Sequence, residues 1–239
     1  MVAAAQDRVA IVTGGSRGIG RAVAVAAARR GWRVVLGYAR NEAAARDTVA
    51  AIETAGGNAL AVRCDVGSEA DIQALFNTAD GFGPLAALVN NAGIVAPALR
   101  VEDMTAERIE HILRVNVTGS FLCAREAVRR MSTRHGGKGG VIVNLSSVAA
   151  QLGSPGIYVD YAASKGAIDT LTVGLGNEVA TEGIRVVGVR PGLIDTEIHA
   201  TAGDPDRHHR LAGPVPMRRA GAAEEIANAR PWPMSGEAT

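Results

Sequence analysis

The chain has 239 residues, a formal net charge of +1 at pH 7 and 47% hydrophobic residues, enough for one large domain or two small ones with a sizeable core. Only 3% of the residues are aromatic and 29 are glycine, so the core must be aliphatic and many tight turns are expected. The sequence contains no long basic run that would indicate nucleic-acid binding, no apolar segment long enough to span a bilayer and no signal-peptide pattern. We therefore expect a soluble cytoplasmic protein that binds neither nucleic acid nor membranes.

Six short apolar runs alternate with longer Ala-rich amphipathic stretches. The runs are rich in β-branched residues and lack polar alternation, which is typical of strands buried on both faces; they cover residues 8–12, 33–38, 59–62, 86–89, 141–145 and 185–189. The helical patterns cover residues 19–30, 42–55, 69–79, 108–131 and 160–183. This alternation predicts an α/β fold, with one doubly wound parallel sheet and helices on both faces. Because no linker or repeat divides the chain, we interpret residues 1–239 as a single domain.

A glycine-rich turn follows the first predicted strand in "VAIVTGGSRGIGRA". Gly14, Gly18 and Gly20 lie where the chain must turn sharply into a helix. The unpaired N–H groups and the dipole at such a helix start favour a pyrophosphate, which side chains would block. A purely structural strand-to-helix turn is the alternative, because a glycine-rich turn alone is a weak signal.

The end of the second predicted strand bears on which dinucleotide binds. An acidic residue there would hydrogen-bond the ribose 2′-OH of NAD, but "LGYARN" carries no carboxylate at Tyr38 or Ala39. Arg40 follows, and Arg17 lies in the glycine turn, so paired guanidiniums favour the 2′-phosphate of NADP. A merely solvated Arg40 is the alternative for that residue, and NAD is the alternative cofactor. Asp65, after the third strand, is equally well interpreted as an adenine contact or as the cap of the next helix.

Two tyrosines precede a lysine in "GIYVDYAASKGA". Tyr161 and Lys165 are four residues apart and so share one face of a helix. A nearby ammonium stabilises a phenolate and lowers a tyrosine pKa from its usual value near 10. Tyr158 is seven residues from Lys165 and is interpreted as a wall of the substrate pocket. Spacing therefore assigns proton transfer to Tyr161.

An ordered set of motifs resembles the short-chain dehydrogenase/reductase family. The motifs are "TGGSRGIG" (13–20), "NNAG" (90–93), "VNVTG" (115–119), "NLSS" (144–147), "YAASK" (161–165) and "RPG" (190–192). The resemblance runs from about residue 7 to about residue 229. It implies a Rossmann-type sheet, a nicotinamide cofactor and an active site of Ser147, Tyr161, Lys165 and Asn116.

The resemblance also suggests what the other residues do. Ser147 would hydrogen-bond the substrate oxygen, with Ser146 as its rival, and Asn116 would hold a water that links Lys165 to solvent, unless it is simply a satisfied buried Asn. Asn90 is expected to tie neighbouring strands together. The candidate cofactor-binding residues are Gly14, Ser16, Arg17, Gly18, Ile19, Gly20, Arg40, Asp65, Val66, Asn91, Ala92, Gly93, Tyr161, Lys165, Pro191, Gly192, Ile194 and Thr196.

The substrate side is less specific. Residues 198–221 are expected to form a lid, in which His208 and His209 with Arg207 and Arg210 invite a metal or anion interpretation. Solvated histidines are favoured, and no metal site is predicted, since neither these histidines nor the distant Cys64 and Cys123 have metal-ligand partners at suitable spacing.

Some members of the family reduce 3-oxoacyl groups on a carrier protein, and others act on sugars, polyols or steroids. Arg134 fits a basic carrier-docking site beside the active-site mouth, whereas Glu182 stands where such reductases often carry a base, and this weakens the carrier-protein interpretation.

The sequence thus predicts an NADP-dependent oxidoreductase that acts on a small carbonyl or secondary alcohol as a homo-oligomer, either a tetramer or a dimer. A cofactor-binding but non-catalytic sensor or scaffold is the alternative.

After "AEEIANA" the chain reads "RPWPMSGEAT" (230–239), where Pro231 and Pro233 do not suit a continuing helix. We expect a truncated or altered C-terminus without the family's seventh strand, which would expose strand six as a sheet edge and weaken assembly.

Overall fold

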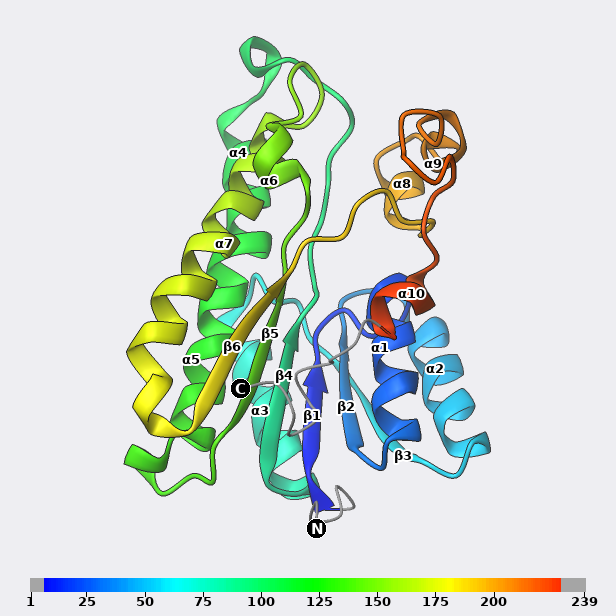
Figure 1. Cartoon of the computed structure of the whole chain (residues 1–239). Coiled ribbons are helices and arrows are strands. Elements are labelled where there is room, and N and C mark those ends of the chain that lie inside the picture. The colour runs from blue at the N-terminus through cyan, green and yellow to red at the C-terminus, as the bar shows by residue number, and fades with distance from the viewer. Residues whose placement is uncertain (1–6, 229–239) are drawn as a thin grey trace.

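A single parallel sheet of six strands organises the computed structural model, which describes residues 7–228. The strands are β1 (Val9–Val12), β2 (Arg33–Tyr38), β3 (Asn58–Arg63), β4 (Leu85–Asn90), β5 (Gly140–Leu145) and β6 (Ile184–Val189). Their order is β3-β2-β1-β4-β5-β6 (Figure 1). The predicted doubly wound sheet is confirmed, and each predicted strand is present to within one residue at either end. The strand order reverses between β1 and β4, which is where ligands bind in such sheets.

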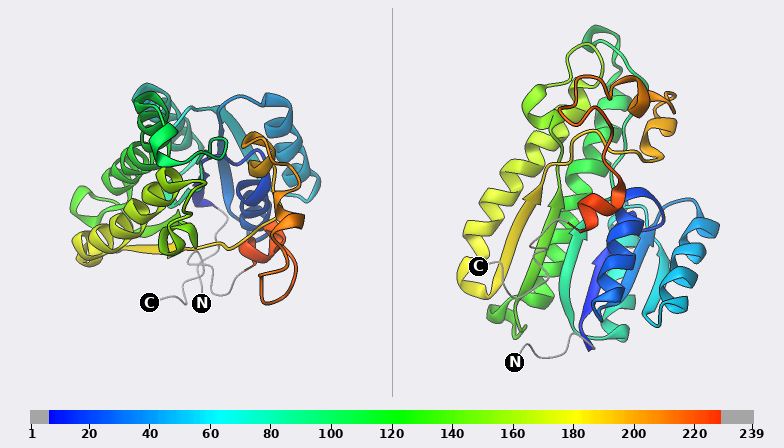
Figure 2. Two further views of the ribbon diagram at one scale, coloured as in Figure 1. Left: turned by 90° about the horizontal axis from the view of Figure 1, so that it is seen from above. Right: turned by 45° about the vertical axis from the view of Figure 1, so that its right-hand side comes forward.

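Helices cover both faces of this sheet (Figures 1 and 2). One layer contains α1 (Gly18–Arg29), α2 (Glu42–Thr54) and the short α10 (Ala223–Ala227). The other layer contains α3 (Glu69–Phe82), α5 (Gly119–Met131) and α7 (Val159–Val179). Shorter helices lie towards the carboxyl edge of the sheet, namely α4 (Ala106–Leu113), α6 (Ala149–Leu152), α8 (Ile198–Thr201) and α9 (Arg207–Arg210). Single 3-10 turns lie at Val101–Asp103, Thr133–His135 and Ala180–Glu182.

The packing of β1 explains why its sequence lacks polar alternation. Val9 and Ile11 join the core cluster beneath α3 and α5, whereas Ala10 and Val12 join the cluster beneath α1 and α2. All four side chains are fully buried. A strand covered on both faces must be apolar at every position, and this run therefore fixes the centre of the sheet.

The long helical pattern of residues 108–131 is interrupted, contrary to expectation. After α4, a π-helical turn spans Arg114–Thr118, and α5 begins at Gly119. A Cβ at Gly119 would lie 2.6 Å from the carbonyl oxygen of Val66, so the helix passes very close to the chain that follows β3. π-Helical turns insert an extra residue into a helix and occur frequently at functional sites.

Among residues 7–228, β6 pairs only with β5 and forms one edge of the sheet. The C-terminal sequence predicted to be altered, residues 230–239, lies outside the described residues.

No helix in the described part of the chain is long and apolar enough to cross a membrane. Cys64 and Cys123 are buried and unpaired with each other, and burial raises the pKa of both thiols, that of Cys64 to about 12.

Candidate active site

The predicted site residues all follow carboxyl ends of strands or lie on helices that begin there. They occupy the β1–α1 turn, the segments after β2, β3, β4, β5 and β6, the π-helical turn, and the first two turns of α7. Because carboxyl ends of parallel strands share one edge, the topology gathers these distant segments along that edge.

The glycine turn and the segment after β4 are bonded to each other. The side-chain amide of Asn91 donates to the carbonyl oxygens of Thr13 and Gly14, at 2.9 and 3.1 Å. The backbone N–H groups of Asn91 and Ala92 both donate to the Thr13 hydroxyl at 3.0 Å. A Cβ on Gly20 would lie 2.2 Å from the carbonyl oxygen of Gly14, so only glycine allows α1 to start this close to the strand.

The start of α1 is suited to an anion. Its N-cap, Arg17, makes no side-chain capping hydrogen bond, and the first turn contains no acidic residue. The orphan N–H groups of a helix start therefore have no side-chain cap. Ile19, one residue into the helix, packs partly buried against the α1–α2 core cluster.

The two arginines of the predicted NADP site lie on neighbouring segments. The backbone N–H of Gly15 donates to the carbonyl oxygen of Gly37 at 2.9 Å, and the Thr48 hydroxyl of α2 donates to the carbonyl oxygen of Ser16 at 3.3 Å. These bonds join the turn that carries Arg17 to the end of β2 and to α2, the two elements between which Arg40 lies. Both arginines are exposed, and within residues 7–228 neither guanidinium has a hydrogen-bond or ion-pair partner.

Asp65 is not the cap of the next helix. That N-cap is Ser68, whose hydroxyl accepts from the N–H of Asp71, while the exposed carboxylate of Asp65 accepts from the N–H of Gly67 at 2.9 Å. The capping alternative is therefore wrong. Val66 is buried, with its carbonyl oxygen facing Gly119.

Tyr161 and Lys165 lie one turn apart near the start of α7. The Lys165 ammonium is 5.6 Å from the centroid of the Tyr161 ring. It donates to the carbonyl oxygen of Leu145, the last residue of β5, at 2.7 Å. Burial lowers the pKa of Lys165 to about 8, while the charge of Asp169 opposes this shift.

The pKa of Tyr161 differs from the expectation based on spacing. Burial raises the pKa of this phenol above its ordinary value, and hydrogen bonding with Ser147 only partly opposes the shift. The prediction that the neighbouring ammonium lowers the pKa of Tyr161 is therefore wrong. The reason is that desolvation of the phenolate dominates.

The two candidate serines have different environments. The Ser146 hydroxyl is buried and donates to the carbonyl oxygen of Lys165 at 3.1 Å. Ser147 is partly exposed, its hydroxyl accepts from the N–H of Ala149 at 3.1 Å, and its side chain lowers the pKa of the nearby Tyr161 phenol. Ser147 is therefore the serine with access to a molecule beside Tyr161.

Asn116 bridges three segments from inside the π-helical turn. Its Oδ1 accepts from the N–H of Ile94 at 2.8 Å, and its Nδ2 donates to the carbonyl oxygen of Ile94 and to the hydroxyl of Ser164, each at 3.0 Å. A Cβ on Gly93 would lie 3.3 Å from Asn116 Oδ1 and 3.6 Å from Lys165 Nζ. The side chain thus has the bonds of a satisfied buried Asn and lies in the same neighbourhood as Lys165.

Asn90 does tie neighbouring strands together, because its amide donates to Asn144 of β5 at 3.0 Å.

The segment after β6 closes the site beside the glycine turn. The N–H of Val148 donates to the carbonyl oxygen of Pro191 at 3.1 Å, and Gly192 follows in an exposed position. Ile194 forms a parallel bridge with Gly221. The Thr196 side chain would lie 3.2 Å from a Cβ on Gly18. The predicted nicotinamide-side residues therefore connect the glycine turn to the lid.

An ion pair that the sequence did not reveal holds the start of α7. Arg108 of α4 donates from Nε to Asp160 Oδ2 at 2.8 Å and from Nη1 to the carbonyl oxygen of Pro97 at 2.6 Å. Asp160 also accepts from the N–H of Tyr161 at 2.9 Å. An acidic residue in a helical first turn is a recognisable signal, but nothing in the sequence points to a partner 52 residues away.

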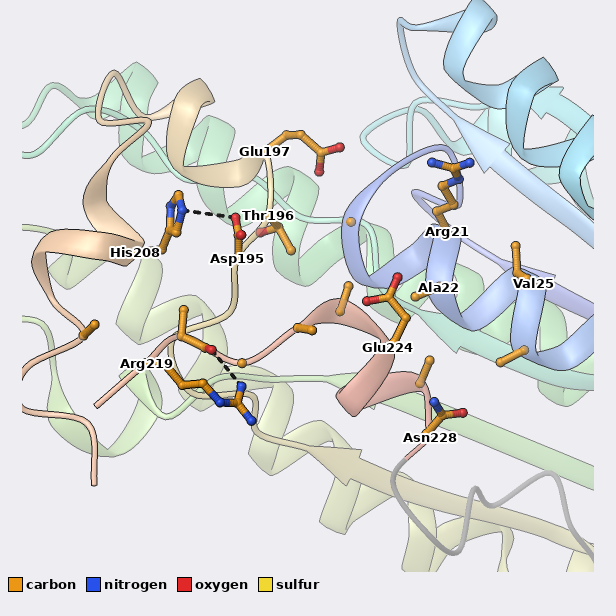
Figure 3. Close-up of a pocket in the computed structure, with 18 of the residues that line it drawn as sticks. Arg21, Ala22, Val25, Asp195, Thr196, Glu197, His208, Arg219, Glu224 and Asn228 are labelled. Carbon is orange, nitrogen blue, oxygen red and sulfur yellow. Dashed lines mark hydrogen bonds and ion pairs between the residues drawn. The ribbon is translucent and has the colours of Figure 1, made fainter. Parts of the chain in front are cut away.

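A groove of about 960 Å³ runs along the outer side of α1, bounded by the lid and α10 (Figure 3). Gly18 and Thr196 line it, but Ser147, Tyr161, Lys165 and Asn116 do not. Figure 3 shows His208 turned towards Asp195, with Nε2 and Oδ1 3.3 Å apart. No group of three or more His, Cys, Asp or Glu residues in residues 7–228 could hold a metal ion.

Arg134 is not beside this site, contrary to expectation. It lies in the 3-10 turn before β5, at the amino edge of the sheet, and its guanidinium is 4.0 Å from Glu182, which precedes β6. The catalytic candidates lie at the carboxyl edge. Arg134 therefore cannot form part of a docking surface at the active-site mouth of its own chain.

Comparison with known proteins identifies the family of this chain. A profile of the short chain dehydrogenase family matches residues 8–207. The chain belongs to this family. It is therefore an oxidoreductase of the short-chain dehydrogenase/reductase family, whose members use NAD or NADP and act on small molecules.

Three relatives align along nearly the whole chain. An uncharacterized oxidoreductase of Escherichia coli, YgfF, is 55% identical over 97% of this chain and 94% of its own. Glucose 1-dehydrogenase 2 of Bacillus subtilis is 37% identical over 97% of this chain and 89% of its own. The 3beta-hydroxysteroid dehydrogenase 1 of Eggerthella lenta is 39% identical over 98% and 89%. The names of the last two show that similar family members act on chemically different substrates.

The fold is shared with solved structures of the family. A dehydrogenase/reductase from Sinorhizobium meliloti superposes with a TM-score of 0.84 at 33% identity, covering 92% of this chain and 84% of its own.

Proposed function

We propose that this protein is an NADP-dependent oxidoreductase that transfers a hydride between nicotinamide and a carbonyl or secondary alcohol. The observation that supports this most strongly is the grouping around Tyr161. Interaction with the Ser147 side chain lowers the pKa of its phenol, and its ring is 5.6 Å from the Lys165 ammonium. These are the groups that proton transfer to and from a carbonyl oxygen requires.

In the reduction direction, the Tyr161 hydroxyl gives its proton to the substrate oxygen, and in oxidation it takes that proton back. The Ser147 hydroxyl hydrogen-bonds the same oxygen and orients it. When bound, the nicotinamide supplies or accepts the hydride. A raised pKa keeps the phenol protonated but makes it a weaker acid, so release of its proton in reduction needs a nearby positive charge.

Lys165 and Asn116 act behind Tyr161 in this proposal. A lysine with a pKa of about 8 exchanges its proton readily near neutral pH, and its charge favours the phenolate. Asn116 holds the segment after β4 against the same lysine through Ile94. We propose that it also positions the water through which Lys165 is reprotonated.

The residues present fit a dinucleotide. The uncapped start of α1 suits the pyrophosphate, and a Cβ at Gly20 would close this cradle. Asn91, Ala92 and Gly93 would contact the ribose on the nicotinamide side, and Asp65 and Val66 the adenine. Pro191, Gly192, Ile194 and Thr196 would flank the nicotinamide.

The preference for NADP rests on Arg17 and Arg40. Two exposed guanidiniums without protein partners in residues 7–228 lie on segments joined by the Gly15–Gly37 hydrogen bond. Arginine binds phosphate with paired hydrogen bonds. A 2′-phosphate between them would supply the missing anionic partner.

We also propose that the protein assembles with copies of itself in the cytoplasm. Phe121 on α5 and Val173 on α7 are 49% and 66% exposed, and large apolar side chains on a helical surface favour association.

A panel assay tests the proposed reaction. NADPH and NADH oxidation is measured with simple ketones, keto acids, sugars and steroid ketones, with cofactor binding measured in parallel. Turnover that is faster with NADPH supports the proposal. Tight cofactor binding without turnover of any class would instead favour a non-catalytic sensor or scaffold.

A further inference from the structure

The lid contacts the start of α7 through the ring of Tyr158. The guanidinium carbon of Arg207, in α9, lies 4.8 Å from the centroid of the Tyr158 ring. In Figure 1, α9 and α6 stand on opposite sides above the carboxyl edge of the sheet, and α7 begins on the α6 side. The contact between Arg207 and Tyr158 therefore joins the two sides of the opening.

This contact is close to the reacting groups in the chain. Tyr158 is the N-cap residue of α7 and Tyr161 lies in its first turn, three residues later. Tyr158 is 6% exposed, so its ring is a fixed platform. The guanidinium over this ring lies at the same end of α7 as Tyr161.

Of the four arginines in the lid, Arg207 and the exposed Arg218 have no carboxylate partner within residues 7–228, and of these two only Arg207 is partly buried. Arg210, on the same helix, pairs with Asp204, and Arg219 pairs with Glu225 at 2.7 Å. Within the part of the chain that the structure describes, the Arg207 guanidinium has no carboxylate or carbonyl partner, although the residue is partly buried.

The contact with the ring gives the N–H donors of the guanidinium no oxygen acceptor within residues 7–228. Such donors match a carboxylate or phosphate with paired hydrogen bonds. A partly buried cation without such a partner is unfavourable, so the arrangement is suited to an incoming anion.

We propose that Arg207 is a specificity residue that binds an anionic group, a carboxylate or a phosphate, on the substrate. This inference rests on the proposed function, since it places the anion of a carbonyl substrate beside Tyr161. The lid sequence offered four basic residues as a solvated or anion-binding group, and this proposal assigns anion binding to Arg207 alone.

Matched substrates test this assignment. Levulinate is compared with methyl levulinate, and dihydroxyacetone phosphate with dihydroxyacetone, so that each pair differs in the anionic group. Arg207→Ala should lower kcat/KM for an anionic member at least about tenfold, the size expected for loss of a charged hydrogen bond. It should change the neutral member by less than about twofold, which is within ordinary surface effects. The pair that responds tells carboxylate from phosphate.

Two controls separate other roles of the arginine. Arg210→Ala removes a charge from the same helix that is already paired, and it should leave the ratio between pair members unchanged. Affinity for NADP should be the same in wild type and Arg207→Ala. An equal loss for charged and neutral substrates, or a loss of NADP affinity alone, would overturn the proposal, because Arg207 would then be a latch or a cofactor contact.

A binding measurement keeps this test separate from the proposed reaction. Levulinate and dihydroxyacetone phosphate are titrated calorimetrically into the NADP-saturated protein. If nothing is turned over, the proposed function fails, but anion binding that disappears in Arg207→Ala still supports the anion site. If the wild type shows no preference for either anionic probe over its neutral counterpart, the inference is wrong.

Discussion

The Lys165 ammonium and the Leu145 carbonyl oxygen are joined by a buried hydrogen bond of 2.7 Å. The bond ties the second turn of α7 to the end of β5, and Ser146 returns a second bond to the carbonyl oxygen of Lys165 at 3.1 Å. Ser147 follows directly. These two bonds fix the start of α7, which carries Tyr161, against the end of β5, which precedes Ser147, and such fixed placement is the preorganisation that catalysis needs.

The burial of Lys165 makes stability depend on pH in a defined direction. Its pKa is about 8 in the folded protein against an ordinary value of 10.5, so between these values the unfolded chain binds more protons. The free energy of unfolding contributed by Lys165 must therefore rise as the pH rises through this window, by roughly 3 kcal/mol in all.

The Lys165→Met variant, which lacks this titrating group, is the reference for the pH dependence of wild-type stability. Urea unfolding of both proteins between pH 8 and 10.5 should show the wild type gaining stability relative to the variant. Titrations of groups that do not interact with Lys165 are shared and cancel in the difference. A difference that does not change with pH would show that Lys165 is not titrating from a buried site.

The close approach at Gly20 can be tested with a matched pair of Gly→Ala substitutions, one in the glycine turn and one in α7. Gly20→Ala places a Cβ 2.2 Å from the Gly14 carbonyl oxygen, so we expect a loss of about 1–3 kcal/mol of stability together with weaker NADP binding. Gly174→Ala, inside α7, meets no atom within 4 Å and should stabilise by about 0.5–1 kcal/mol. Thermal unfolding and NADP titration measure both; similar effects at the two positions would argue against the close approach.

Removing one partner of the Arg108–Asp160 ion pair should lower the free energy of unfolding more than replacing both partners by apolar residues. The side chains are 12% and 2% exposed, so Asp160→Ala leaves a largely buried cation and should cost about 3–5 kcal/mol. The double variant Arg108→Met with Asp160→Leu should cost clearly less. Urea unfolding of the three proteins measures this, and a double variant as unstable as the single one would contradict it.

Features that depend on local sequence could be predicted, whereas features that depend on contacts between distant residues could not. The strands were readable because β1 and its neighbours need apolar side chains on both faces, and the Tyr161–Lys165 pairing because helical spacing is local. The π-helical turn could not be predicted, because it accompanies a hydrogen bond between Asn116 and Ile94 and the close approach of Gly119 to Val66. The pKa of Tyr161 was misjudged for the same reason: spacing shows a neighbouring charge but does not show burial.

Cofactor preference has its own test in Arg40. Arg40→Asp should weaken NADP binding and strengthen NAD binding, because a carboxylate repels the 2′-phosphate and accepts from the 2′-OH. Arg17→Ala should weaken NADP alone. Dissociation constants for both cofactors, measured by fluorescence titration, give the ratio. An unchanged ratio in Arg40→Asp would remove the basis for the NADP assignment.

The most direct test of the proposed mechanism is the Tyr161→Phe substitution, assayed with NADPH and a carbonyl that the wild type reduces. We expect turnover to fall by about 10²- to 10⁴-fold while NADPH still binds with unchanged affinity, since only the proton donor is removed. Tyr158→Phe, three residues away, keeps its ring beneath Arg207 and should lose far less. Near wild-type turnover in Tyr161→Phe with intact cofactor binding would contradict the role proposed for this tyrosine.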